Sequence, residues 1–169
     1  MFVSFFMILI VVGCMLATGW KDLTSMTIPN WISLVLVAGF FITAPFAWQG
    51  WAVFGTHILV GLVCFFIGVT LFAFGQMGGG DAKLFAATSI WWVWADLGHY
   101  AIYTALAGGV LTLLIILGRK YLPEKALKTD WLHHLFKDEK KIPYGIALAF
   151  GALVTLPTSD LYLYASGIA

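Results

Sequence analysis

The stretch AVFGTHILVGLVCFFIGVTLFAFGQMGGGDAKL, residues 52–84, decides the fold expected for this chain. Its first part, 52–74, carries no acidic residue, lysine or arginine and is long enough to cross a bilayer, which takes about 20 apolar residues in a helix. The three glycines Gly78 to Gly80 then weaken the helix, and Asp81 follows them directly. An ionised carboxylate loses hydration near hydrocarbon, so acids at that depth are rare and usually functional. Because irregular backbone survives there only where protein or water covers it, the stretch predicts a small wet cavity inside a membrane protein.

The composition of the whole chain indicates a protein that crosses the membrane several times. Of its 169 residues, 62% are hydrophobic and only 10% are charged, and the mean hydropathy is +0.96. A soluble domain carries about 25% charged residues. The net charge of +1 gives no reason to expect nucleic-acid binding. The two cysteines, Cys14 and Cys64, lie inside apolar runs and form no CxxC pair, so we expect neither a zinc site nor a redox site.

Apolar segments predict an all-α, polytopic membrane fold with about six transmembrane helices, forming a single integral-membrane domain over 1–169. The candidate segments are 2–20, 31–48, 52–74, 82–97, 99–118 and 144–166. The first segment lacks the basic start of a signal peptide and is too long for its apolar core, so we expect it to be retained. The tryptophans Trp91, Trp92 and Trp94 are typical of an aromatic belt at the outer membrane interface.

The basic residues predict the orientation of these spans. With six spans, all nine of them fall on one side of the membrane: Lys21, Lys83, Arg119, Lys120, Lys125, Lys128, Lys137, Lys140 and Lys141. An excess of Lys and Arg marks the cytoplasmic side, so we expect both termini to lie outside. Asp22 and Asp81 fall on the cytoplasmic side. Asp96 and Asp160 fall on the opposite side, where we expect ordinary interfacial acids.

The one long connection, residues 119–142, combines most of these basic residues with a helical apolar spacing. Leu127, Trp131 and Leu135 follow one another at i, i+4 and i+8 and therefore share one helix face. We expect a cytoplasmic amphipathic helix that lies on the inner leaflet. Two interpretations stay open, since such a helix can either shield the apolar side chains of the loop or dock a substrate.

Asp22 and Asp81 would make a chemically useful pair if the fold brings them together. Two facing carboxylates do not both ionise easily, so one keeps a proton and the pair titrates as a unit. The ionised member can take a proton from water while the protonated member polarises a carbonyl, as in aspartic proteases. Spacing alone leaves ordinary roles open, namely a loop acid beside Lys21 for Asp22 and an acid stabilised by a helix N-terminus for Asp81.

Three short motifs of the chain resemble those of the type IV prepilin peptidases, a family of intramembrane aspartyl proteases. Asp22-Leu-Thr-Ser-Met-Thr-Ile28-Pro29-Asn30 resembles the first family motif, in which an Asp is followed six residues later by Ile-Pro-Asn. Gly78-Gly79-Gly80-Asp81-Ala82-Lys83-Leu84 resembles the second motif, Gly-x-Gly-Asp-x-Lys-Leu. Lys141-Ile142-Pro143-Tyr144-Gly145-Ile146-Ala147 is similar to a third block before the last span, so the resemblance runs from about residue 10 to 155. The length and the lack of paired CxxC motifs are similar to the short build of the family, found in Flp-type (tight-adherence) pilus systems.

The resemblance implies a function and a role for each matching residue. Asp22 and Asp81 would be the catalytic pair that activates water. The substrate-binding residues would be Gly78, Gly79, Gly80, Lys83, Pro29, Asn30, Pro143, Tyr144 and Gly145. The substrate would be a type IV (Flp-type) prepilin or pseudopilin, whose leader is removed at the cytoplasmic face of the bacterial inner membrane. The resemblance implies no metal, no organic cofactor and no N-methyltransferase activity.

Other interpretations of the same residues stay open. Pro29 could simply start a helix, and Lys83 could extend its amine to the membrane interface. A small proton-coupled transporter would use the two acids as a relay, but both acids sit at one end of their spans, so no relay crosses the membrane. An inactive homologue could serve as a membrane scaffold in a pilus assembly system, although the presence of both aspartates weighs against this function.

Overall fold

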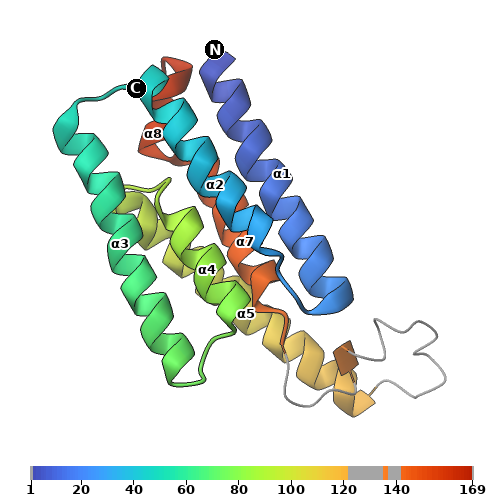
Figure 1. Cartoon of the computed structure of the whole chain (residues 1–169). Coiled ribbons are helices and arrows are strands. Elements are labelled where there is room, and N and C mark those ends of the chain that lie inside the picture. The colour runs from blue at the N-terminus through green and yellow to red at the C-terminus, as the bar shows by residue number, and fades with distance from the viewer. Residues whose placement is uncertain (1, 122–134, 137–141, 169) are drawn as a thin grey trace.

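The computed structural model describes residues 2–121, 135–136 and 142–168, and these form a bundle of helices (Figure 1). In chain order the elements are α1 (Phe2–Ser25), α2 (Asn30–Thr43), η1 (Ala44–Ala47), α3 (Trp51–Ala73), α4 (Gly79–Ser89), α5 (Trp94–Tyr121), α7 (Tyr144–Thr155), η3 (Leu156–Thr158) and α8 (Asp160–Ser166). No strand occurs among the described residues, so the all-α prediction is confirmed.

Several of these helices are long and apolar enough to cross a membrane. The helices that pass this test singly are α1, α2 together with η1, α3 and α5. The α7–η3 segment and α8 meet at a bend of 44° and add a fifth span if they are counted as one. The prediction of a multi-span helical protein is therefore confirmed. The count of six and the placement of both termini outside stay predictions, because α4 has only 11 residues.

The boundary between the fourth and fifth predicted spans was wrong. α4 ends at Ser89 rather than at 97, and α5 begins at Trp94 rather than at 99. Two backbone hydrogen bonds close a tight turn between them, from Trp91 N–H to the Thr88 carbonyl and from Trp92 N–H to the Ser89 carbonyl, each 3.1 Å. Asp96 then starts α5, because its Oδ2 accepts the backbone N–H of Val93 at 3.4 Å.

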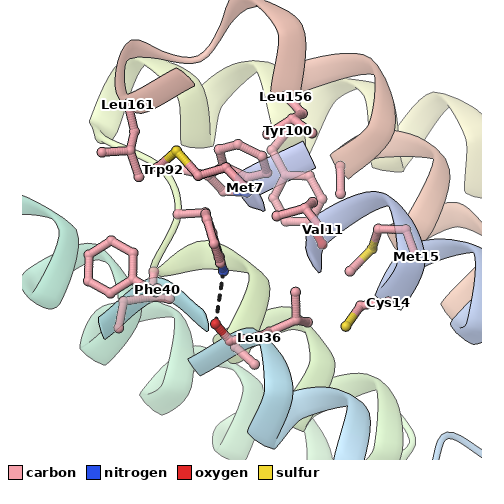
Figure 2. Packing of buried hydrophobic residues seen from close by; sticks show 14 of the residues in the cluster. Met7, Val11, Cys14, Met15, Leu36, Phe40, Trp92, Tyr100, Leu156 and Leu161 are labelled. Carbon is pink, nitrogen blue, oxygen red and sulfur yellow. Dashed lines mark hydrogen bonds between the residues drawn. The ribbon is translucent and has the colours of Figure 1, made fainter. Parts of the chain in front are cut away.

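The tryptophans of this turn belong mainly to the protein core (Figure 2). Trp91 and Trp92 are 1% and 0% exposed, whereas Trp94 is 49% exposed. The indole N–H of Trp91 donates to the Leu36 carbonyl of α2 at 3.2 Å, the dashed bond in Figure 2. The aromatic-belt prediction was therefore wrong for Trp91 and Trp92, because the turn directs both rings against α2 and α5 instead of toward lipid.

The short helix α4 lies inside the bundle and packs against α2, α3 and α7 (Figure 1). α3 approaches it closely through two glycines. A Cβ atom on Gly61 would lie 3.3 Å from the Ile90 side chain, and one on Gly68 would lie 3.1 Å from the Ala82 carbonyl oxygen. Small residues at such positions let helix backbones come together in membranes. The close packing holds the first turn of α4 beside the C-terminal end of α1 and the N-terminal end of α7.

The predicted amphipathic helix of the 119–142 connection falls almost wholly outside the described residues. Leu127 and Trp131 belong to the part that the structure does not describe. Leu135 is buried, and its carbonyl accepts a hydrogen bond from the Arg119 guanidinium at 3.2 Å. This bond ties the end of the connection to the C-terminal turns of α5.

Candidate active site

Asp22 lies in the last turn of α1, which continues to Ser25. Its side chain is only 4% exposed, while the neighbouring Lys21 is exposed. The alternative of a loop acid beside a lysine was therefore wrong, because the helix turns successive side chains in different directions. The backbone amides of Gly145 and Ile146, at the start of α7, face the Asp22 carboxyl group.

The chain leaves α1 through a strained residue close to Asp22. Met26 donates its backbone N–H to the Asp22 carbonyl at 3.0 Å. Its φ of 48° is the only left-handed value at a non-glycine residue in the described part of the chain. Such a conformation costs on the order of 1–3 kcal/mol and is found most often at functional sites.

Asp81 lies in the first turn of α4, opposite Asp22. The helix starts with the bond from Ala82 N–H to the Gly78 carbonyl at 2.9 Å, so Gly79 and Gly80 are helical. The glycines therefore do not break the backbone beside Asp81. They allow close contacts instead, because a Cβ atom would lie 3.2 Å from Phe72 at Gly79 and 3.2 Å from Ile28 at Gly80.

Two cavities adjoin both carboxylates. The larger has a volume of about 550 Å³ and is lined by Asp22, Met26, Leu71, Gly75, Gln76, Met77, Gly78, Asp81, Ile142 and Tyr144. The smaller, of about 290 Å³, is lined by Asp22, Met26, Thr27, Ile28, Gly78, Gly79, Gly80 and Asp81. Because both aspartates line both cavities, the carboxylates lie where the cavities meet.

The carboxylates also carry unused hydrogen-bonding capacity. Oδ2 of Asp22 and Oδ1 of Asp81 are buried, and neither has a hydrogen-bond partner among the described residues. Buried polar atoms in proteins are normally paired, either within the protein or with water. A hydrogen-bond donor that reached either oxygen would satisfy it. The two aspartates therefore line space next to carboxylate oxygens that have no partner among the described residues.

The third motif places two of its residues beside this pair. Gly145 packs against Asp22 so closely that a Cβ atom there would lie 2.8 Å from Oδ2 of that carboxylate. Tyr144 lines the larger cavity and is 44% exposed. Pro143 is buried and precedes the first residue of α7, so it starts that helix.

Three other residues from the motifs do not line these cavities. Pro29 stands directly before α2, as the helix-start interpretation predicts. The Lys83 amine donates to Oδ1 of Asn30 at 3.0 Å, which joins the second motif to the first. Both of these side chains border another cavity, between α2, α3 and α4.

Several residues of the two cavities were missed by the sequence analysis. They are Met26, Thr27, Ile28, Leu71, Gly75, Gln76, Met77 and Ile142. Their only signal was position, since most stand inside or directly beside a motif. No three side chains of His, Cys, Asp and Glu gather as a metal site would require in the parts of the chain that the structure describes.

The fold and the site define a multi-span helical membrane protein with two carboxylates at one end of its bundle. The sequence profile of the type IV leader peptidase family matches residues 9–117, a range that includes both aspartates. The chain therefore belongs to the type IV leader peptidase family, whose members are membrane-embedded proteases. No curated protein and no solved structure matches the chain.

Proposed function

We propose that this chain is an intramembrane aspartyl endopeptidase that removes the leader peptides of Flp-type prepilins and pseudopilins. The observation that carries the proposal is that Asp22 and Asp81 line the same two cavities, each with a buried oxygen that has no partner among the described residues. The family match supports a prepilin-like protein substrate.

The proposed reaction uses the two carboxylates as one unit that holds a single proton. The ionised member takes a proton from a water molecule, and the water oxygen attacks the carbonyl carbon of the scissile peptide bond. The protonated member gives its proton to the carbonyl oxygen, so that a neutral tetrahedral intermediate forms. The protonated member then gives its proton to the leaving nitrogen while the ionised member takes a proton from a hydroxyl of the intermediate. The C–N bond breaks, a carboxylic acid and an amine are released, and the pair again holds one proton.

The cavities give a peptide room on both sides of the pair. A substrate helix must unwind before its amide can be attacked, and an extended segment could then run from the larger cavity to the smaller one. The first N–H groups of α4 have no partner within the helix and lie beside the pair, where they can bind substrate carbonyls. Gly78 and Gly79 contribute such backbone without a side chain that would fill the space.

The proposed location of the site is the cytoplasmic face of a bacterial inner membrane. Lys21 and Lys83 belong to the same end of the bundle as the two carboxylates. Arg119 and Lys120 lie in the last turn of α5, which reaches the same end of the bundle in Figure 1. An excess of basic residues marks the cytoplasmic side of membrane proteins.

Co-expression with an Flp-type prepilin tests this function. The wild-type chain should convert the prepilin to the faster-migrating mature form on a gel, whereas Asp22→Asn and Asp81→Asn should leave it uncut at equal protein levels. Cleavage by either variant at the wild-type rate would overturn the proposed roles. A wild-type chain that leaves prepilins and pseudopilins intact but carries protons across liposomes would favour the transporter instead.

A further inference from the structure

A third cavity lies on the opposite face of α4 from the carboxylates, and the proposed peptidase chemistry does not use it. Its volume is about 590 Å³, and its lining includes Leu34 and Val37 of α2, Leu62 and Phe65 of α3, and Ala86 and Ile90 of α4. Lys83 and Ala86 contribute to it from one face of α4, while Asp81 points the other way because it precedes Lys83 by about half a helical turn. We call this cavity the lateral slot.

The lateral slot is apolar at one end and polar at the other. At the apolar end Phe41 lines the slot, and its ring lies near Phe54 of α3, with centroids 6.3 Å apart. At the polar end stand Asn30 and Lys83 with their 3.0 Å hydrogen bond. The slot is therefore an apolar groove with a lysine amine at one end.

The slot is separate from the two cavities of the candidate active site. Among the described residues it shares no lining residue with either of them. Ile28 lines the smaller cavity and packs against Gly80, with its Cβ 3.2 Å from the position that a Cβ on Gly80 would take. A ligand in the slot would therefore not enter the space where the carboxylates act.

We propose that the lateral slot binds one acyl chain of an anionic phospholipid, whose phosphate contacts the Lys83 amine. Both walls of the slot belong to helices that can cross the membrane, so the slot lies within reach of lipid. A lysine amine has three N–H donors, and Asn30 accepts one of them, which leaves two for a phosphate. A lysine near the membrane surface attracts an anionic lipid by about 1 kcal/mol.

The dimensions favour a lipid chain over the apolar helix of a substrate. From Asn30 to Phe41 the slot follows about 16 Å of α2. A helix that crosses the membrane needs about 30 Å, which is about twice the length of the slot. A flexible chain attached to a charged headgroup fits both the apolar length of the slot and its polar end.

Native mass spectrometry of the purified full-length chain tests this proposal. Phosphatidylglycerol and phosphatidylcholine with identical acyl chains are added separately, and the bound fraction is measured. The wild type should retain phosphatidylglycerol about 5-fold better, the ratio that corresponds to about 1 kcal/mol. Lys83→Gln should remove that preference, whereas Lys21→Gln, an exposed lysine at the same end of the bundle but outside the slot, should keep it. A preference that survives in Lys83→Gln would overturn the proposal.

A second pair of variants tests the apolar part of the slot. Ala86→Phe fills it and should reduce binding of both lipids several-fold, while Ala105→Phe on the exposed face of α5 should leave binding unchanged. If Ala86→Phe does not fold, Leu62→Trp on the exposed wall replaces it. Wild-type lipid binding in a folded slot-filling variant would overturn the proposal. Displacement of the bound lipid by the apolar segment of a prepilin would overturn it in favour of a substrate site.

Discussion

The two ends of the bundle each contain a buried aspartate, and the two carboxylates are treated very differently by the protein around them. At the end where α5 and α8 begin, Asp96 is 5% exposed, and its Oδ2 accepts the backbone N–H groups of Val93 at 3.4 Å and Asp160 at 3.1 Å. At the other end, Asp22 is 4% exposed, yet its Oδ2 has no partner among the described residues, and neither has Oδ1 of Asp81.

The difference shows that burial alone does not identify a functional acid. Oδ2 of Asp96 accepts hydrogen bonds from backbone at the starts of α5 and α8 and so holds these two helices together. The positive end of a helix favours a carboxylate in this structural role. Asp22 and Asp81 each keep one oxygen without a partner among the described residues, and both residues line cavities as well as contacting backbone. A buried carboxylate with free oxygens and adjacent space is the stronger candidate for chemistry.

The largest expected difference between the two ends of the bundle is in how aspartate substitutions change the cleavage rate. Asp22→Asn and Asp81→Asn should each lower it by about three orders of magnitude or more, because general acid–base catalysis contributes about 10²–10⁴-fold and both members of the pair take part. Asp96→Asn should stay within about threefold of the wild type. Rates are measured with purified protein in liposomes. An equal loss of cleavage rate in Asp96→Asn would mean that activity depends on a buried carboxylate at either end of the bundle, whether or not its oxygens have partners.

A smaller effect is expected when the position of Asp22 is disturbed without removing its charge. The new Cβ of Gly145→Ala would lie 2.8 Å from Oδ2 of Asp22 and 2.8 Å from Cδ1 of Ile28, so the carboxylate must move. We expect a loss of about 10–100-fold in cleavage rate, since small misplacements of catalytic groups are costly. Gly109→Ala is the matched control, because no atom lies within 4 Å of its new Cβ. Full activity in Gly145→Ala would show that the contact does not position the pair.

The pH dependence of the cleavage rate should depend on Asp22 and Asp81 and not on Asp96. A pair that shares one proton should give a bell-shaped profile, with the rate falling about 10-fold per pH unit on either side. The acid side falls when both carboxyls are protonated, and the alkaline side falls when both are ionised. Cleavage is timed across pH in liposomes, with Asp96→Asn as the control whose profile should match the wild type. A rate that keeps rising into alkaline pH would contradict a shared proton.

The smallest effect is expected at the end of the bundle that holds Asp96. Asp96→Ala leaves two backbone N–H groups without their acceptor and should lower the free energy of unfolding by about 1–3 kcal/mol. Thermal unfolding in detergent, followed by tryptophan fluorescence, measures this change. Cleavage at a temperature where the variant is folded should stay within about threefold of the wild type. Lost cleavage at an unchanged unfolding temperature would assign Asp96 a role in the reaction.

The sequence predicted the helical fold and the placement of Asp22 and Asp81 at the same end of the bundle. Both predictions rest on short-range patterns, namely long apolar runs and the alternation of their ends. The contact between Gly145 and Asp22 could not be predicted in this way, because it depends on α7 packing against α1 after most of the chain has intervened. That the two aspartates line common cavities is likewise a property of the folded bundle.

The prediction that Trp91 and Trp92 face the membrane interface was wrong for a physical reason. A side chain that faces lipid and one that faces a neighbouring helix are both apolar in a membrane protein, so their composition does not distinguish them. The turn between α4 and α5 was missed for a related reason, since Ile90 to Val93 continue the apolar run without Gly or Pro. The only local signal was Asp96 three residues after Val93, and we interpreted it as an interfacial acid.

The shortness of α4 has a consequence for the surrounding lipid. Its 11 residues rise only about 16 Å, whereas the hydrocarbon layer is about 30 Å thick and the 24 residues of α1 rise about 36 Å. A helix that short would force lipids to compress around it if it met them directly, which is the cost of hydrophobic mismatch. α2, α3 and α7 pack against α4, so protein covers much of its surface. We expect this cover to limit the compression of lipid around the short helix that carries Asp81.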